Sequence, residues 1–129
     1  WWDDWASTIS NVFPDGVWTH VAMVYNGSAT GASNRLKVYI NGVNASLVFN
    51  GAIPSSLPSN TLNVQVGAAS DGRYFSGSID ELRIWNRSLS QREVNASFNA
   101  SMYRLSVILL VCLLVIIRIG LGLLILMVV

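Results

Sequence analysis

The sequence predicts an all-β domain, an antiparallel β-sandwich, followed by a short helix and then by an apolar segment. Three observations support this fold class. Short runs of β-forming residues recur along residues 17–86, several of these runs alternate between apolar and polar side chains, and turn-forming residues separate them. The runs do not alternate with helices, so the pattern of a parallel α/β sheet is absent.

The first predicted strand covers residues 17–25, which are dense in β-forming side chains. Turn-forming residues flank it on both sides, at positions 14–16 and 26–28. A short run of this composition between two turns is typical of a strand.

A β-hairpin is predicted over residues 35–49. Its first strand alternates, with one apolar face and one opposite face. The apolar face holds Leu36, Val38 and Ile40, and the opposite face holds Arg35, Lys37 and Tyr39. Asn41–Gly42 follows, the pair preferred in a type I′ turn because both central positions need positive φ. Residues 43–49 then alternate again and form the returning strand.

Two further strands and one helix complete the predicted domain. Residues 62–67 and 78–86 are the strands, and the polar, glycine-bearing residues 68–77 form a surface loop between them. Ser90 precedes Glu93 by three residues, which is the signature of a capping box. It predicts a short helix from about Gln91 to Phe98.

The apolar segment covers residues 105–129 and contains nineteen Leu, Ile or Val residues and one charge, Arg118. As a helix it would span roughly 38 Å, enough to cross a hydrocarbon core of ~30 Å. A central Arg costs about 3 kcal/mol on insertion, and each central Leu, Ile or Val returns roughly 0.3 to 0.6 kcal/mol. We therefore expect a transmembrane helix over 105–129 after a folded domain over 1–103. A buried core helix, or a tail foreign to the natural protein, are the alternatives.

Charge and cysteine content exclude several function classes. Residues 1–104 hold seven basic and seven acidic side chains, so they lack the basic excess of a nucleic-acid binder. The single cysteine, Cys112, lies in the apolar segment. A disulfide scaffold, a cysteine-ligated zinc site and a thiol nucleophile are therefore excluded from the folded part.

Three segments carry a resemblance to laminin G-like domains. Residues 16–27 (GVWTHVAMVYNG) are similar to the G-x-W-x-H-V-A-x-x-Y-D-G strand of that family. Residues 36–42 (LKVYING) resemble its L-x-L-Y-I-N-G hairpin, and residues 75–90 (FSGSIDELRIWNRSLS) resemble its closing element and the start of the helix. The family has the concanavalin A-like jelly-roll fold, shared with pentraxins and legume lectins.

The resemblance implies two packed antiparallel sheets and non-catalytic binding of glycans or proteins outside the cell. Such domains have more strands than this sequence supplies before Trp18, so we expect an N-terminally incomplete sandwich with open sheet edges. The calcium loop of pentraxins corresponds to residues 68–72, where Asp71 is the only acid. Calcium binding is therefore not carried over. Asp71 and Asp15 are the candidates for an oxygen-ligated site, and the alternative is that both are turn residues.

Glycosidases share this fold, so the sequence could in principle hold their pair of catalytic carboxylates. They need two carboxylates facing one cleft, about 5–5.5 Å or 6.5–9.5 Å apart. Glu81 and Glu93 are the only glutamates, and Asp80 and Glu81 are adjacent on a predicted strand and point to opposite faces. We therefore expect no enzyme activity and no cofactor. His20, the only histidine, is expected to be a packed, hydrogen-bonded residue of the strand.

Aromatic residues supply the candidates for ligand contact. Tyr74, with Asp71 and Arg73, lies in the loop at the rim of the sandwich, and this trio is the predicted contact site. Other tryptophans could stack on sugar rings or belong to strands without partners; these are Trp1, Trp2 and Trp5. Trp18 and Trp85 are expected in the core.

Five N-x-S sequons occur, at Asn26, Asn44, Asn86, Asn95 and Asn99. The eleven Asn and nineteen Ser or Thr of residues 1–104 would give about two by chance. The excess favours a glycosylated, extracytoplasmic surface. The alternative is an Asn- and Ser-rich β protein that carries no glycan.

Together these features predict a binding module for a glycan or an extracellular protein, anchored to a membrane by 105–129 with the domain outside. One alternative is a structural repeat of a glycosylated cell-envelope protein with no discrete ligand site. Another is a degenerate glycoside-hydrolase-like domain.

Overall fold

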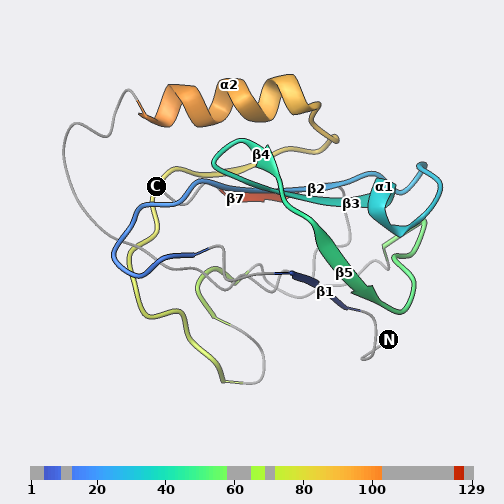
Figure 1. Ribbon diagram of the computed structural model, residues 1–129, viewed down its shortest axis with the longest axis horizontal. Helices are drawn as coiled ribbons and strands as arrows, with labels where there is room; N and C mark the ends of the chain where they lie inside the picture. Colours follow the sequence, from blue (N-terminus) through green and yellow to red (C-terminus); the bar gives the residue numbers. More distant parts are fainter. Residues whose placement is uncertain (1–4, 10–12, 58–64, 69–71, 103–123, 127–129) are drawn as a thin grey trace.

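The computed structural model describes residues 5–9, 13–57, 65–68, 72–102 and 124–126 of the 129. Antiparallel strands and one long helix make up this part of the chain (Figure 1). The elements in chain order are β1 (Trp5–Thr8), β2 (Val21–Tyr25), α1 (Ala32–Arg35), β3 (Leu36–Ile40), β4 (Val43–Asn44), β5 (Leu47–Asn50), β6 (Leu82–Ile84), α2 (Gln91–Met102) and β7 (Leu124–Leu126).

The strands form two layers, and α2 covers the outer face of one of them (Figure 1). β2, β3 and β4 form a three-stranded antiparallel sheet, in which Val21 pairs with Ile40 and Tyr25 with Leu36. β1 pairs with β5 in the other layer, and β6 pairs with β7 beside β2. The predicted antiparallel β-sandwich with a short helix is confirmed.

The hairpin turn agrees with its sequence signal. Asn41 and Gly42 have φ angles of 50° and 78°, the two positive values that a type I′ turn requires. Asn41 also joins the turn to the segment before β2: its N–H donates to the carbonyl oxygen of His20 at 2.9 Å, and its Oδ1 accepts the N–H of His20 at 3.0 Å. The turn therefore connects both strands of the sheet.

The capping box forms as predicted and starts α2. The N–H and hydroxyl of Ser90 both donate to Oε2 of Glu93 at 2.8 Å, and the N–H of Glu93 faces the Ser90 hydroxyl at 3.4 Å. These contacts satisfy backbone donors that the first helical turn leaves without partners. The helix runs to Met102, four residues beyond the predicted end.

The main core lies between the sheet and α2. Ala22 and Val24 of β2 and Tyr39 of β3 pack with Leu89 and Val94, and Trp18 and Trp85 lie against this cluster, as expected. Ala22 and Val94 are completely buried. Because Ala22 has only a methyl group, it allows the helix to approach the sheet closely.

Tyr39 corrects the sequence interpretation of the hairpin. The alternation placed it on the face opposite the apolar residues, yet its side chain is only 4% exposed. The physical reason is that α2 covers that face, so the sheet buries side chains on both sides. Leu36, Val38 and Ile40 are half-buried on the other face. A pattern of period two identifies a strand but does not show which faces receive a cover.

Other predicted strands are shorter in the structure. β2 begins at Val21 instead of Val17, and β6 covers only Leu82–Ile84 of the predicted 78–86. Glu81, with φ of 53°, breaks the extended backbone just before β6. Residues 62–64 lie outside the described residues, and residues 65–67 are not a strand.

Most of the predicted transmembrane helix, 105–123 and 127–129, lies outside the described residues. Its described part, Leu124–Leu126, is a strand and not a helix, which corrects the prediction at these positions. β7 pairs antiparallel with β6, with Ile125 opposite Arg83. A short apolar run fits a buried strand as well as a helix, and the open edge of β6 supplies the partner. Within the described residues, no helix combines the length and apolarity needed to cross a membrane.

A substitution at Gly42 tests how closely the β3–β4 turn approaches α2. Its φ of 78° disfavours any side chain, and a Cβ built there would lie 3.1 Å from both Asn95 Oδ1 and Phe98 Cδ1. Gly72 has φ of 85° with nothing within 4 Å of such a Cβ. We expect Gly72→Ala to lower the free energy of unfolding by about 1 kcal/mol, through backbone strain alone. Gly42→Ala should lower it by roughly 2–3 kcal/mol in urea denaturation. Equal losses in the two variants would contradict the close contact.

Candidate functional site

The predicted contact loop has a fixed base. Tyr74 forms an isolated antiparallel bridge with Ala68, and the N–H of Phe75 donates to the carbonyl oxygen of Gly67 at 2.8 Å. Arg73 and Tyr74 are both exposed, and the tyrosine side chain is 80% accessible. Asp71, the third member of the predicted trio, lies outside the described residues. The structure therefore presents an aromatic ring and a guanidinium group next to each other in sequence on a rim loop.

Of the two calcium candidates, Asp15 lies in the described residues and Asp71 lies outside them. Asp15 lies exposed in the turn Pro14–Gly16, where the N–H of Val17 faces the carbonyl oxygen of Pro14 at 3.4 Å. Within the described ranges, no three His, Cys, Asp or Glu side chains gather closely enough to hold a metal ion. Asp15 therefore has the position of a turn residue.

The two glutamates are held in ion pairs. Glu81 pairs with Arg83, and Glu93 pairs with Arg87 at 2.6 Å. Hydrogen bonds from Arg87 and then from Ser90 hold the pKa of the Glu93 carboxyl at about 2, below its ordinary value of 4.5. A glycosidase acid needs a raised pKa so that it can donate a proton. Glu93 therefore has the chemistry of a helix cap and not of a general acid.

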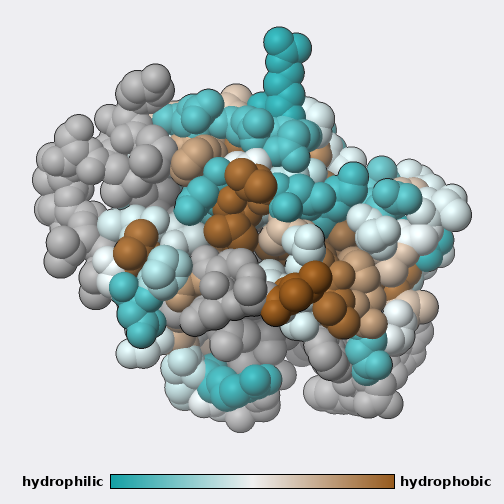
Figure 2. All heavy atoms as spheres, in the orientation of Figure 1, coloured by the Kyte–Doolittle hydropathy of each residue, from teal (hydrophilic) through white to brown (hydrophobic). Residues whose placement is uncertain are grey.

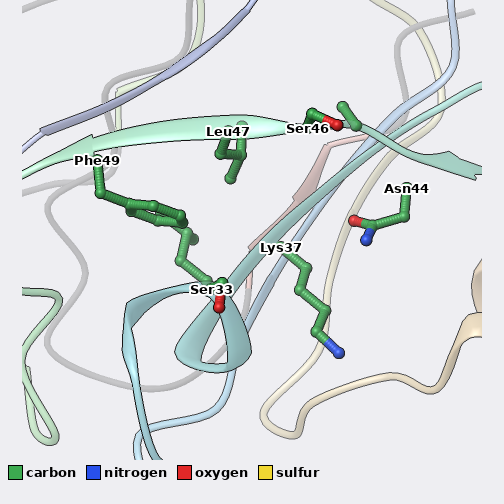
Figure 3. Close-up of a pocket in the computed structure, with 8 residues that line it drawn as sticks. Ser33, Lys37, Asn44, Ser46, Leu47 and Phe49 are labelled. Atoms are coloured by element: carbon green, nitrogen blue, oxygen red, sulfur yellow. The ribbon is translucent and has the colours of Figure 1, made fainter.

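A hollow of about 230 Å³ lies between α1, β3 and the segment from β4 to β5 (Figure 3). Half of its lining is polar: Ser33, Lys37, Asn44 and Ser46. The other half is apolar: Leu36, Ala45, Leu47 and Phe49. Within the described part of the chain, the four polar side chains make no hydrogen bond or ion pair. Their bonding capacity is therefore available to a bound group.

Sequence reasoning missed this hollow because one wall depends on α1. The sequence pattern predicts no element for residues 32–34 and places Arg35 in the hairpin strand, but Ala32–Arg35 form a short helix stabilised by Arg35. The guanidinium Nε of Arg35 donates to the carbonyl oxygen of Ala29 at 2.8 Å, and its Nη1 donates to that of Ile53 at 2.9 Å. The local sequence signal of the hollow is the Asn44–Ser46 sequon, which lies three residues before the aromatic Phe49.

His20 is buried beneath α2, as expected, but the expected hydrogen bonds are not found. Its side chain is 3% exposed, and its ring lies 5.4 Å from that of Phe98 between centroids, tilted by 55°. Neither ring nitrogen has a hydrogen-bond partner in the described part of the molecule, and the same holds for Nε1 of Trp18. Burial, followed by the positive charge of Arg83, lowers the pKa of His20 from 6.5 to about 4. His20 is therefore neutral at physiological pH.

All five sequon asparagines lie in described segments. Asn44, Asn86, Asn95 and Asn99 are exposed, and Asn26 is partly exposed. Their serines differ: Ser97 and Ser101 of α2 are buried, whereas Ser28, Ser46 and Ser88 are exposed. Of the predicted sugar-stacking tryptophans, Trp5 lies in β1, and Trp1 and Trp2 lie outside the described residues.

Comparisons with known proteins agree with the geometry of the fold. A family model described as the concanavalin A-like lectin/glucanases superfamily, and named for laminin G, matches residues 1–95. The human adhesion G-protein coupled receptor D1 is 29% identical over 90 residues, which cover 68% of this chain and 10% of the receptor. The chain thus spans about a tenth of the length of that relative. No solved structure matches significantly.

The buried imidazole of His20 should make stability depend on pH. Because its pKa is about 4 in the folded chain and 6.5 when unfolded, the unfolded state binds the proton more tightly. The contribution of the neutral His20 ring to the free energy of unfolding is therefore fully present above pH 6.5 and is lost as the pH drops toward 4. Between pH 7 and 5 we expect a loss of about 1–2 kcal/mol in the free energy of unfolding.

Urea denaturation at pH 7 and pH 5 measures this loss, and His20→Gln is the control. The variant has no titrating ring, so its stability should change little between these two pH values. Glu93 does not interfere, because its contribution is lost only as the pH falls from 4.5 toward 2. An equal pH dependence in both proteins would contradict the assignment to His20.

Proposed function

The chain belongs to the concanavalin A-like lectin/glucanase superfamily as a laminin G-like domain, and from this membership we propose that it is a non-catalytic binding module of the adhesion type. The family match over residues 1–95 is the observation that carries the proposal. The similarity to an adhesion receptor supports it. The proposed ligand is a glycan or an extracellular protein.

The ion pairs of the two glutamates support a binding function without catalysis. Glu81 and Glu93 each face an arginine, and Glu93 also accepts hydrogen bonds from Ser90. Carboxylates that are held by arginines can hold a helix cap or a strand end, and Glu93, whose pKa is lowered, does not donate a proton to a leaving group at neutral pH. The proposal therefore assigns no catalytic residue and no cofactor to the chain.

The proposed ligand contact is the rim loop with Arg73 and Tyr74, together with Asp71. Tyr74 combines a large apolar ring with a hydroxyl group, a combination favoured both on sugar faces and at protein interfaces. The bridge between Tyr74 and Ala68 holds the backbone in place, so binding would not require the loop base to become ordered.

The proposed compartment is the outer face of a membrane. The five sequons and the similarity to a membrane receptor support an extracellular domain over 1–103. The nineteen aliphatic residues of 105–129 support an anchor. In this structure Leu124–Leu126 instead pair with β6, so a membrane and the edge of β6 are the two alternative surroundings for these residues.

Tyr74→Ala should weaken ligand binding about tenfold, the loss typical of a central interface tyrosine. A printed glycan array and a cell-surface binding assay measure the effect. Val43→Ala is the matched control, because Val43 is 70% exposed and belongs to β4, outside residues 68–77 of the rim loop. Unchanged binding in Tyr74→Ala would move the site elsewhere. Absence of any ligand would favour a structural repeat, and hydrolysis of a glycan on the array would favour the glycosidase alternative.

Membrane fractionation tests the proposed anchor. The full chain should stay in the membrane pellet after an alkaline carbonate wash, because a spanning apolar helix resists this extraction. A chain that ends at Arg104 should be released. Recovery of the full chain in the carbonate supernatant would contradict the anchor and would favour the strand position of Leu124–Leu126.

A further inference from the structure

We propose that Asn44 carries an N-linked glycan and that the hollow between α1, β3 and β5 is the seat of its inner sugars. The inference rests on the extracellular placement proposed above, because N-glycans are attached in the secretory route. It assigns a modification to one sequon and a role to the hollow.

The sequon itself lines the hollow. Asn44 and Ser46 are both exposed, and both contribute to its wall with Ala45 between them. Asn44 ends the two-residue strand β4, and the chain reaches β5 at Leu47. A sugar linked to the amide of Asn44 therefore begins at the edge of the hollow.

The chemistry of the linkage requires a free amide. Nδ2 of Asn44 attacks the anomeric carbon of a lipid-linked oligosaccharyl pyrophosphate. The new bond joins nitrogen to that carbon, the bond from the carbon to the pyrophosphate oxygen breaks, the lipid pyrophosphate leaves, and the amide loses one proton. The Asn44 amide makes no hydrogen bond in the described part of the chain.

The lining has the composition that a sugar ring needs. In Figure 3, Phe49 and Asn44 lie at opposite ends, and Lys37 and Leu47 lie between them. Phe49 and Leu47 offer apolar surface to the C–H face of a sugar, and Lys37 and Ser33 can bond its hydroxyl and N-acetyl groups. The volume of about 230 Å³ is below the range of pockets for drug-sized ligands, which suits one or two sugar rings.

Apolar surface is also present on the two strands beside the hollow, but outside its lining. Hydrophobic side chains reach the surface over β4 and β5 (Figure 2), where Val43 is 70% exposed and Val48 is 50% exposed. By alternation Val48 points away from Leu47 and Phe49, so sugars seated in the hollow leave it exposed. The seated glycan would close the hollow to other ligands, so the rim loop remains the proposed site of ligand contact.

The experiment uses the full chain, directed into the secretory route of cultured mammalian cells by an added leader. Site-resolved mass spectrometry measures occupancy at Asn44 and at Asn86, an exposed sequon that does not line the hollow. Peptide N-glycosidase is then applied to the native protein. We expect release from Asn44 to be about tenfold slower than from Asn86, because the seated sugars must first leave the hollow. In the denatured protein the two rates should be equal.

Two variants connect the protection to the hollow. Phe49→Leu keeps an apolar side chain but removes the aromatic ring, and Lys37→Met keeps the stem but removes the charge. Each should raise the native release rate at Asn44 toward that at Asn86. Asn44→Gln should remove one glycan from the intact mass.

Each contrary outcome has a defined meaning. Equal native release rates at both sites overturn the seating of the glycan. An unmodified Asn44 beside a modified Asn86 overturns this inference alone. A chain unmodified at every sequon overturns the inference and also removes the support that the sequons give to the extracellular placement. The ligand-binding result for Tyr74→Ala is measured separately, so failure of the adhesion proposal remains distinguishable.

Discussion

The contact of α2 with the β3–β4 turn is the constraint on which the rest of the structure depends. Nε2 of Gln91 donates to the carbonyl oxygen of Gly42 at 2.6 Å, and Phe98 lies over His20. The same turn holds His20 through Asn41. One helix thus fixes the turn of the hairpin and encloses the sheet face that bears Ala22 and Tyr39. Because the ring nitrogens of His20 have no hydrogen-bond partner among the described residues, this packing depends on keeping His20 uncharged.

Local sequence signals predicted the parts of the fold that local interactions determine. The Asn41–Gly42 turn and the Ser90–Glu93 cap each depend on backbone groups a few residues apart, and both have the predicted geometry. The burial of Tyr39 depends on a helix about fifty residues or more away in the sequence, and so does the burial of the His20 ring, which has no hydrogen-bond partner within the described ranges. The hollow likewise combines α1 with β5. Alternation within one strand contains no information about such partners.

The two faces of β6 are covered to different extents in the described structure. Trp85 lies against the cluster under α2, so by alternation Leu82 and Ile84 point to the other face. Their side chains are 41% and 50% exposed. The helix side therefore supplies the closed core, and the second face holds apolar surface that the described strands cover only in part. Apolar strand residues without cover favour further strand pairing, and β7 at the edge of β6 is an instance of it.

The helix side, the hollow and the rim loop differ in how much surface they leave for binding a ligand. The helix side is occupied by packing and by the cap, where Glu93 and Arg87 neutralise each other. The hollow beside β5 contains the only lysine of the chain and the Asn44 sequon, and filling it with the chain's own sugar leaves no room for a second guest. The rim loop is different, because its backbone is bridged at Ala68 while the Tyr74 ring stays in solvent. A rigid base with an exposed aromatic tip is the arrangement that loses least entropy when a partner binds. The proposed ligand contact at the rim and the proposed glycan in the hollow therefore use separate surfaces of the domain.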